Sequence, residues 1–194
     1  MHDEPADRLV GALVAERYRI TRKLGEGGMG SVYEAEHELI GKRVALKCLN
    51  PELTRAPEIV KRFRREARAA TAVGNEHIVD VTDFGTLPDG SPFMVMEHLD
   101  GVELGNLVES EGPLPIGRAC RIVKEICEAL GAAHEKGVVH RDLKPENVFL
   151  VRRGGRSDFV KVLDFGISKF TEPEKSAHLT RTGVTMGTPH YMSP

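Results

Sequence analysis

Glycines are concentrated in one short stretch of the chain, and they limit what this stretch can fold into. Four of the six residues in Gly25-Glu26-Gly27-Gly28-Met29-Gly30 have no side chain. Such a run lets the backbone approach a phosphate closely and present its N–H groups to it. A dinucleotide-binding fold would need a helix directly after these glycines. Here Val32-Tyr33-Glu34-Ala35 continues as a strand, so we predict a glycine-rich hairpin covering phosphates.

A second pattern places a small residue and a cation on the same face of a strand. In Val44-Ala45-Leu46-Lys47 the side chains alternate, so Ala45 and Lys47 share one face. A small residue beside an ammonium group suits a flat base that lies next to its phosphates. An ordinary lysine on an edge strand would give the same pattern, and this segment alone leaves both interpretations open.

An acidic residue falls close to the apolar stripe of a helix that we predict over residues 57–73. The stripe comprises Ile59, Phe63, Ala67 and Ala70. A carboxylate at Glu66, beside this stripe, is costly unless it is paired, and we expect Lys47 to be its partner. We expect the basic residues of the run from 61 to 65 to form a solvated face.

The remaining pattern predicts strands within residues 18–49, at 78–84 and at 92–97, and a second helix over 116–136. The apolar stripe that we expect this helix to bury comprises Ile116, Ala119, Cys120, Val123, Cys127, Leu130 and His134. Residues 138–166 alternate short apolar runs with loops, and 171–194 read as a long loop. Strands with one helix, followed by a helical segment, predict an α+β fold.

Charge and cysteine content exclude several classes of protein. The chain has 194 residues, and 27 Lys and Arg against 29 Asp and Glu give a net charge of −2. This balance argues against a nucleic-acid binder. No apolar run reaches the roughly 20 residues of a membrane span, and no signal peptide is visible. The spacing of Cys48, Cys120 and Cys127 argues against disulfides or a zinc site, so we expect them in the core.

The segment richest in chemistry is His140-Arg141-Asp142-Leu143-Lys144-Pro145-Glu146-Asn147. Pro145 prevents a regular helix through its middle, so we predict a loop that carries a carboxylate, a cation and an amide. Such a loop can orient a hydroxyl group, neutralise phosphate charge and bind a metal ion. Beyond it, Asp164-Phe165-Gly166 follows the predicted strand Val160 to Leu163, which places a carboxylate well for Mg²⁺.

Taken in this order, the motifs resemble those of the eukaryotic-like serine/threonine protein kinases, in their bacterial branch. The resemblance runs from about Tyr18 to Pro194. It implies a two-lobe fold with an N-terminal extension (1–17), a complete N-lobe of antiparallel sheet plus one helix (18–97), and a partial helical C-lobe (98–194). The family closes its activation segment with a glutamate after Ser-Pro, so we expect further helices beyond Pro194.

The resemblance implies a nucleotide site for ATP. The glycine-rich run would cover the phosphates, Lys47 would hold them while paired with Glu66, Met96 would be the gatekeeper, and the hinge from Glu97 to Leu99 would meet adenine. The residues implied to contact the nucleotide are Leu24, Gly25, Glu26, Gly27, Gly28, Met29, Gly30, Val32, Ala45, Lys47, Met96, Glu97, Leu99 and Phe149.

The resemblance also implies roles in phosphate transfer. Asp142 would be the catalytic base, Lys144 would lie beside the transferred phosphate, and Asn147 with Asp164 would bind Mg²⁺, for which Mn²⁺ could substitute. The stacked regulatory spine implied by the family comprises His140, Phe165, Ala70 and Val81.

For regulation, the resemblance implies that Arg141 grips a phosphorylated residue of the activation loop, with Thr180 and Thr182 as the candidates. The alternative is that these are only loop-forming polar residues. Thr188 would instead contact the catalytic loop near Asp142 and Lys144.

The function that follows is transfer of the ATP γ-phosphoryl group to Ser or Thr hydroxyls of proteins, and Lys144 is typical of kinases with this specificity. The alternative is a module that binds ATP without catalysis, like a pseudokinase or a fragmentary scaffold. A third function, that of a dinucleotide-dependent oxidoreductase, is disfavoured because the sequence lacks the strand–loop–helix unit that it requires. The implied partners are protein substrates and a second copy for autophosphorylation, with no nucleic acid. We expect a cytoplasmic location.

Overall fold

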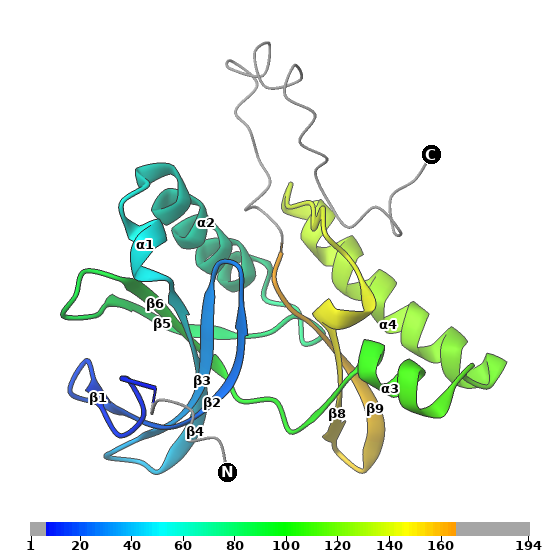
Figure 1. Ribbon diagram of the computed structural model, residues 1–194. Helices are drawn as coiled ribbons and strands as arrows, with labels where there is room; N and C mark the ends of the chain where they lie inside the picture. The colour runs from blue at the N-terminus through cyan, green and yellow to red at the C-terminus, as the bar shows by residue number, and fades with distance from the viewer. Residues whose placement is uncertain (1–6, 166–194) are drawn as a thin grey trace. The chain divides into compact units, whose positions relative to one another are not determined.

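The computed structural model describes residues 7–165, which form two compact units (Figure 1). The first unit holds the described residues up to Ala67 together with Asp80–Leu99. The second holds Arg68–Val79 and the described residues from Asp100 onward. The lobe boundaries expected at residues 17 and 97 remain a prediction.

The first unit is built on a six-stranded antiparallel sheet with the strand order β1-β2-β3-β4-β6-β5. Its strands are β1 Leu13–Val14, β2 Tyr18–Gly27, β3 Gly30–His37, β4 Lys42–Leu49, β5 Val81–Thr86 and β6 Pro92–Glu97. The strands expected within 18–49 and at 92–97 are confirmed. The strand expected at 78–84 begins later, at Val81, because Ile78 pairs instead with Val162 in the second unit.

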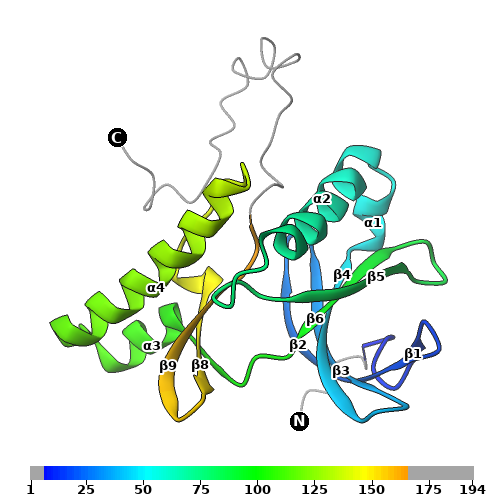
Figure 2. The same ribbon diagram turned by 180° about the vertical axis from the view of Figure 1, so that it is seen from behind.

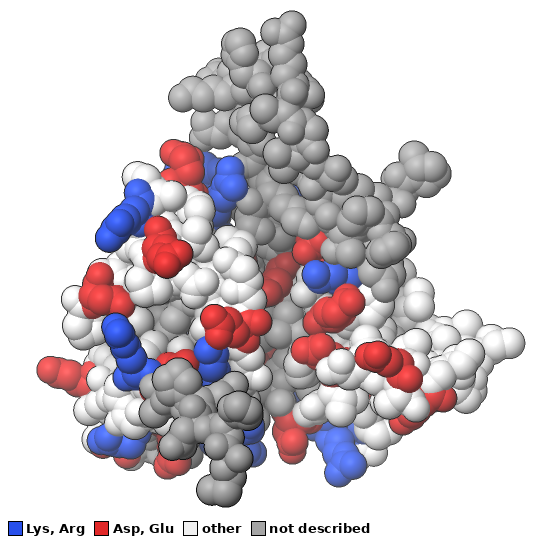
Figure 3. Space-filling model, viewed as in Figure 1, with Lys and Arg blue, Asp and Glu red and all other residues white. Residues whose placement is uncertain are grey.

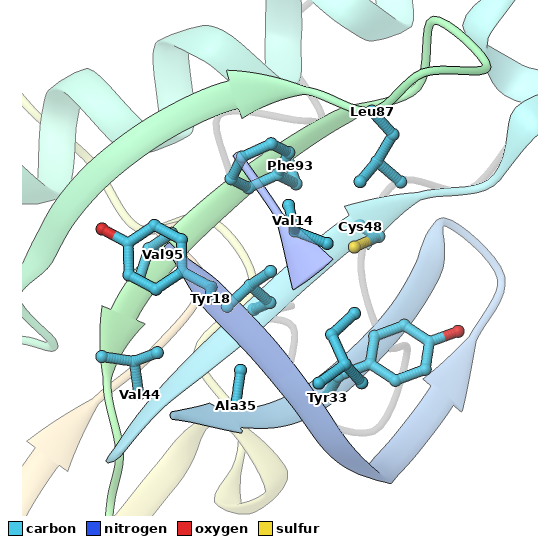
Figure 4. Packing of buried hydrophobic residues seen from close by; sticks show 11 residues of the cluster. Val14, Tyr18, Tyr33, Ala35, Val44, Cys48, Leu87, Phe93 and Val95 are labelled. Atoms are coloured by element: carbon cyan, nitrogen blue, oxygen red, sulfur yellow. The ribbon is translucent and has the colours of Figure 1, made fainter. Parts of the chain in front are cut away.

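One face of this sheet carries the hydrophobic core of the first unit (Figure 4). Its buried members are Val14, Tyr18, Ile20, Tyr33, Ala35, Val44, Leu46, Cys48, Leu87, Phe93 and Val95. The alternation along β4 sends Val44, Leu46 and Cys48 into this core, so Ala45 and Lys47 lie on the opposite face, as predicted. Burial raises the pKa of the Cys48 thiol to about 12, with the charges of Asp89 and Asp7 adding to it, so this cysteine is an unreactive core residue.

A long helix, α2 (Pro57–Val73), follows the short helix α1 (Pro51–Thr54). The bounds of α2 are those predicted from its apolar stripe, whereas α1 was not predicted. Phe63 of α2 is 2% exposed, and its ring lies 5.8 Å from that of Phe84 on β5, which fixes the helix on the sheet of the first unit.

The second unit pairs a small antiparallel sheet with two helices, which lie on the same side of its β8–β9 hairpin (Figure 2). The strands are β7 Gly101–Glu103, β8 Val148–Arg153 and β9 Arg156–Val162, and the helices are α3 Leu104–Glu111 and α4 Ile116–Glu135, with a 3₁₀ turn at Pro145–Asn147. The strand expected at 160–163 is therefore the end of β9.

The buried face of α4 differs from the prediction. The residues of α4 that are buried are Ile122, Glu125, Ala129 and Ala133. The expected stripe lies largely on the exposed side, where Ile116 is 83% exposed, Val123 is 55% exposed, and Cys120 and Cys127 are exposed thiols. The core positions predicted for these two cysteines are therefore wrong. Periodicity locates an apolar stripe on a helix but does not show which face is buried. In α4 the face with small alanines is buried, because it allows closer packing against β9.

Glu125 is the centre of a buried polar network in the second unit. Its carboxylate accepts a hydrogen bond from the Val160 backbone N–H at 3.0 Å and pairs with the guanidinium of Arg156. His77, in the segment after α2, lies 3.5 Å from the same carboxylate and contacts the Val160 carbonyl oxygen at 3.0 Å. The His77 ring also stacks on Phe159, with 4.5 Å between centroids. One carboxylate thus joins α4, β9 and the segment that carries His77.

Charged residues of both signs are interspersed over the described residues on the face shown in Figure 3. This pattern agrees with the net charge of −2. Among residues 7–165, no helix has the length and apolar character needed to cross a membrane.

The Glu125 network predicts a large cost for its removal. We expect Glu125→Ala to lower the free energy of unfolding by about 1–3 kcal/mol, because it leaves the buried Val160 N–H without its acceptor. Urea denaturation of the full-length protein measures this. Glu135→Ala is the matched control, since this exposed glutamate lies at the end of the same helix, and its change should stay within about 0.5 kcal/mol. Equal losses in the two variants would contradict the assigned role of Glu125.

Candidate active site

The predicted ion pair between Lys47 and Glu66 is confirmed in the first unit. Lys47 Nζ of β4 lies 2.9 Å from Glu66 Oε1 of α2, and the two side chains are only 15% and 8% exposed. The packing of Phe63 one turn earlier holds the helix so that Glu66 faces the sheet. A pair this shielded holds the ammonium group in one place, which is what a phosphate contact requires.

The glycine-rich run forms the turn of the β2–β3 hairpin, as predicted, with Gly27 opposite Gly30. The four glycines differ in what a side chain would meet. A Cβ atom at Gly30 would lie 1.9 Å from the Cys48 carbonyl oxygen of β4, so the fold itself demands this glycine. At Gly25, Gly27 and Gly28 a Cβ atom would meet nothing within 4 Å. The space beside these three glycines can therefore admit an approaching ligand.

The strand register places several predicted nucleotide contacts on one face of the sheet. Val32 pairs with Lys47 across β3 and β4, while Ala45 pairs with Met96 across β4 and β6. Directly paired residues point to the same face, and residues two apart along a strand do so too. Val32, Ala45, Lys47 and Met96 therefore share the face that also receives Glu66. Leu24, beside a register shift in β2, is 41% exposed.

The segment from Glu97, the last residue of β6, to Leu99 is held by hydrogen bonds at its first two residues. Glu97 Oε1 accepts a hydrogen bond from the Asp80 N–H at 2.9 Å, and the backbone N–H of Glu97 donates to the Asp80 carbonyl oxygen at 3.0 Å. His98 Nε2 lies 3.2 Å from Glu34 Oε2. Glu34 was not among the predicted site residues, and His98 was predicted only as part of the hinge from Glu97 to Leu99, because nothing in the sequence near either one points to the other.

In the second unit, the catalytic-loop candidates are fastened to the strand that leads to Asp164. The Leu163 N–H donates to the Asn147 carbonyl oxygen at 2.9 Å, and His140 Nε2 donates to the Leu163 carbonyl oxygen at 2.8 Å. His140 Nδ1 accepts the Asp142 N–H at 3.3 Å, so the neutral ring with its proton on Nε2 satisfies both bonds. Both backbone groups of Leu163 are therefore hydrogen-bonded to this loop, and these bonds fix the position of Asp164, the next residue.

Asp142 and its neighbours have a distinct local geometry. Lys144 Nζ lies 3.9 Å from Asp142 Oδ2, and the Asn147 side-chain amide donates to the Asp142 carbonyl oxygen at 2.8 Å. Arg141, with φ 62°, and Asp164, with φ 49°, are two of the four non-glycine residues with left-handed backbones among the described residues; the other two directly follow β1. Such strain is found where surrounding contacts hold a functional side chain in place. Burial lowers the pKa of the Arg141 guanidinium.

Metal binding would draw on few protein groups. Within the described residues, no three His, Cys, Asp or Glu side chains gather closely enough to hold a metal ion. Because the amide nitrogen of Asn147 donates to Asp142, its amide oxygen is directed away from that bond, as a ligand atom must be. A site of one amide oxygen and the Asp164 carboxylate suits Mg²⁺, which commonly takes its other ligands from substrate phosphates and water.

Other predicted residues are placed as follows. The rings of His140 and Phe165 lie 4.8 Å apart, as the first two members of the expected spine. Ala70 and Val81 are buried, and their stacking with this pair remains a prediction. Phe149 is half-buried on β8 of the second unit. Thr180, Thr182 and Thr188 lie outside the described residues.

Residues 18–194 match the protein kinase domain family. The chain belongs to the protein kinase family. The predicted α+β, protein-kinase-like fold is confirmed by solved structures: the PknI kinase domain of Mycobacterium tuberculosis is 34% identical, with a TM-score of 0.69 over 86% of this chain and 66% of that one.

Curated relatives of this kinase chain are bacterial proteins named serine/threonine-protein kinases. Pkn1 of Myxococcus xanthus is 48% identical over 193 residues, which cover 98% of this chain and 27% of that protein. PknH of Mycobacterium tuberculosis is 40% identical over 97% of this chain and 29% of that protein. The chain thus spans about a third or less of the length of these two relatives.

The glycines of the kinase hairpin predict a contrast in stability. Gly30→Ala should lower the free energy of unfolding by about 1–3 kcal/mol, because its Cβ atom must displace the backbone of β4. Gly27→Ala, in open space, should change it by no more than about 0.5 kcal/mol. Urea denaturation of the full-length protein without nucleotide measures both. A destabilising effect of Gly27→Ala as large as that of Gly30→Ala would contradict the distinction.

Proposed function

We propose that this chain carries the catalytic activity of a serine/threonine protein kinase and transfers the γ-phosphoryl group of ATP to Ser or Thr hydroxyls of proteins. The observation that supports this best is the double hold on Leu163 by His140 and Asn147. It sets the loop that carries Asp142, Lys144 and Asn147 in a fixed relation to Asp164 within one compact unit. Catalysis of phosphoryl transfer is mainly positioning and charge stabilisation, so such rigidity is what the reaction needs.

In this proposal each residue of the loop has one task. The substrate hydroxyl oxygen forms a bond to the γ-phosphorus atom, the bond from that phosphorus to the bridging oxygen breaks, and ADP leaves. Asp142 orients the hydroxyl group and accepts its proton, while the Lys144 ammonium group stabilises charge on the transferred phosphoryl group. Magnesium held by Asn147 and Asp164 would supply further neutralisation of phosphate charge.

The first unit would supply the nucleotide contacts. Lys47, steadied by Glu66, would pair with the α- and β-phosphates, and the backbone at Gly25, Gly27 and Gly28 would cover them. The open space beside these three glycines supports this role, since side chains there would meet the ligand rather than the protein. Val32 and Ala45 would contact the adenine ring, and Glu97 to Leu99 would bind its edge.

The proposal extends to partners and regulation. We further propose protein substrates with Ser or Thr acceptors, self-association for autophosphorylation and a cytoplasmic location. A phosphate on Thr180 or Thr182 would add about −1.5 to −2 charge that the Arg141 guanidinium could bind.

The direct test is transfer of radiolabelled phosphate from Mg·ATP to protein by the full-length gene product. We expect Asp142→Asn to lower turnover by about 10²–10⁴, the usual contribution of a positioned general base, with little change in KM for ATP. A variant that lost ATP binding but kept its turnover at saturating nucleotide would reverse the assigned role. Absence of any transfer by the wild-type protein would instead favour an ATP-binding module without catalysis.

The Lys47–Glu66 pair predicts a second outcome. Lys47→Met should abolish transfer, because it removes a phosphate contact and the ammonium group that lies 2.9 Å from the shielded Glu66 carboxylate. Circular dichroism should show most of the secondary structure retained. Lys42→Met is the matched control, since Lys42 is an exposed lysine of the same strand. Near-normal turnover of Lys47→Met, measured in the same assay, would refute the role given to Lys47.

A further inference from the structure

A polar cluster in the first unit connects the Glu97–Leu99 segment to Glu34 and Arg22, which the family motifs do not name. Glu34 of β3 is its centre: Oε2 accepts a hydrogen bond from Arg22 Nη2 of β2 at 2.7 Å and lies 3.2 Å from His98 Nε2. The side chains of Glu34 and His98 are only 13% and 12% exposed, whereas Arg22 is 63% exposed. Water therefore screens the Glu34–His98 contact weakly, and this contact can fix the position of both groups.

The contacts of Glu34 determine its charge and the direction of its hydrogen bond with His98. Burial by itself raises the pKa of Glu34, but the hydrogen bond and charge of Arg22, followed by His98, lower it below its ordinary value. Glu34 is therefore ionised and can only accept hydrogen bonds. It follows that His98 donates from Nε2, which both the protonated ring and one neutral tautomer can do.

The cluster joins two parts of the proposed nucleotide site. Glu34 lies on β3 two residues after Val32, on the same face of the sheet, and is paired with Ala45 of β4. His98 lies in the middle of the Glu97–Leu99 segment. Because β4 separates β3 from β6 in the sheet, the Glu34–His98 contact spans a strand. It connects the strand that carries the glycine hairpin directly to the segment proposed to bind adenine.

That segment is then held from two directions at consecutive residues. Glu97 is fixed to the backbone of Asp80, before β5, at 2.9 and 3.0 Å. His98 is fixed to Glu34, on β3. Hydrogen bonds to a purine edge depend on backbone groups placed to within a few tenths of an ångström, so a segment held at only one residue would bind less selectively.

We propose that Glu34 and His98 are positioning residues for the nucleotide: their contact sets the affinity for ATP and the preference for adenine over guanine. This inference rests on the proposed kinase function. Neither residue touches the reacting atoms, so the contact affects binding of the base rather than the chemical step. Arg22 assists by keeping Glu34 ionised.

The experiment uses steady-state kinetics of the full-length protein with ATP and with GTP. Glu34→Ala and His98→Ala should each raise KM for ATP about tenfold, as expected for loss of one charge-assisted hydrogen bond, with kcat within about twofold of the wild-type value. The ratio of kcat/KM for ATP to that for GTP should fall in both variants. The double variant should raise KM little beyond either single change, because both remove the same contact.

Two further variants separate positioning from a general effect. Glu36→Ala removes an exposed carboxylate from the same strand and face, and it should leave KM and base selectivity unchanged. His98→Gln keeps an N–H donor and should restore much of the ATP affinity lost in His98→Ala. A matching rise in KM in Glu36→Ala, or no rescue by His98→Gln, would overturn the inference.

Failure of the inference is distinguishable from failure of the proposed function. Active Glu34→Ala and His98→Ala proteins with wild-type KM and base selectivity would refute the positioning role and leave the kinase function intact. Absence of phosphate transfer by the wild-type protein would refute the function itself. If Glu34→Ala does not fold, His98→Ala alone decides, since its effect on selectivity is measured on the folded enzyme.

Discussion

The ion pair between Lys47 and Glu66 is the interaction on which the first unit depends. Both side chains are largely withdrawn from water, so either charge without the other would be costly. The pair therefore ties α2 to β4 and fixes the helix by charge as well as by the packing of Phe63 on Phe84. The result is an ammonium group with a defined place on the face of the sheet that carries Val32 and Ala45.

The same constraint on buried polar groups organises the second unit. Glu125 is 6% exposed and satisfies the Val160 N–H, while His140 is 2% exposed and bonds to Leu163 and Asp142. Among the described residues, every buried side-chain nitrogen or oxygen has a hydrogen-bond partner. The hydrogen-bond partners of these buried groups lie on different elements of the unit. Forming these bonds therefore places the catalytic-loop candidates beside the end of β9.

Local signals predicted much of the fold and of the candidate site. The period of the apolar residues gave α2 with its bounds, and the strand pattern around the glycines gave the β2–β3 hairpin. Because an unpaired carboxylate near a buried stripe is costly, Lys47 was correctly predicted as the partner of Glu66. The predicted buried face of α4 was wrong. This helix carries two apolar stripes, and its packing against β9 decides which of them is buried. The start of β5 was also misplaced, since Ile78 has a partner 84 residues away.

The sequence by itself determined which chemical groups the chain carries and in what order, since the glycine run, Lys47, Glu66, the loop from His140 to Asn147 and Asp164 are all recognisable from residue type and spacing. Only the tertiary structure decided that Glu34 meets His98, 64 residues further along the chain. It also distinguished Gly30, which the backbone of β4 crowds, from Gly27, which nothing crowds. The physical reason is that spacing encodes neighbours within one element, whereas contacts between elements depend on the register of the sheet and on which buried charges must find partners.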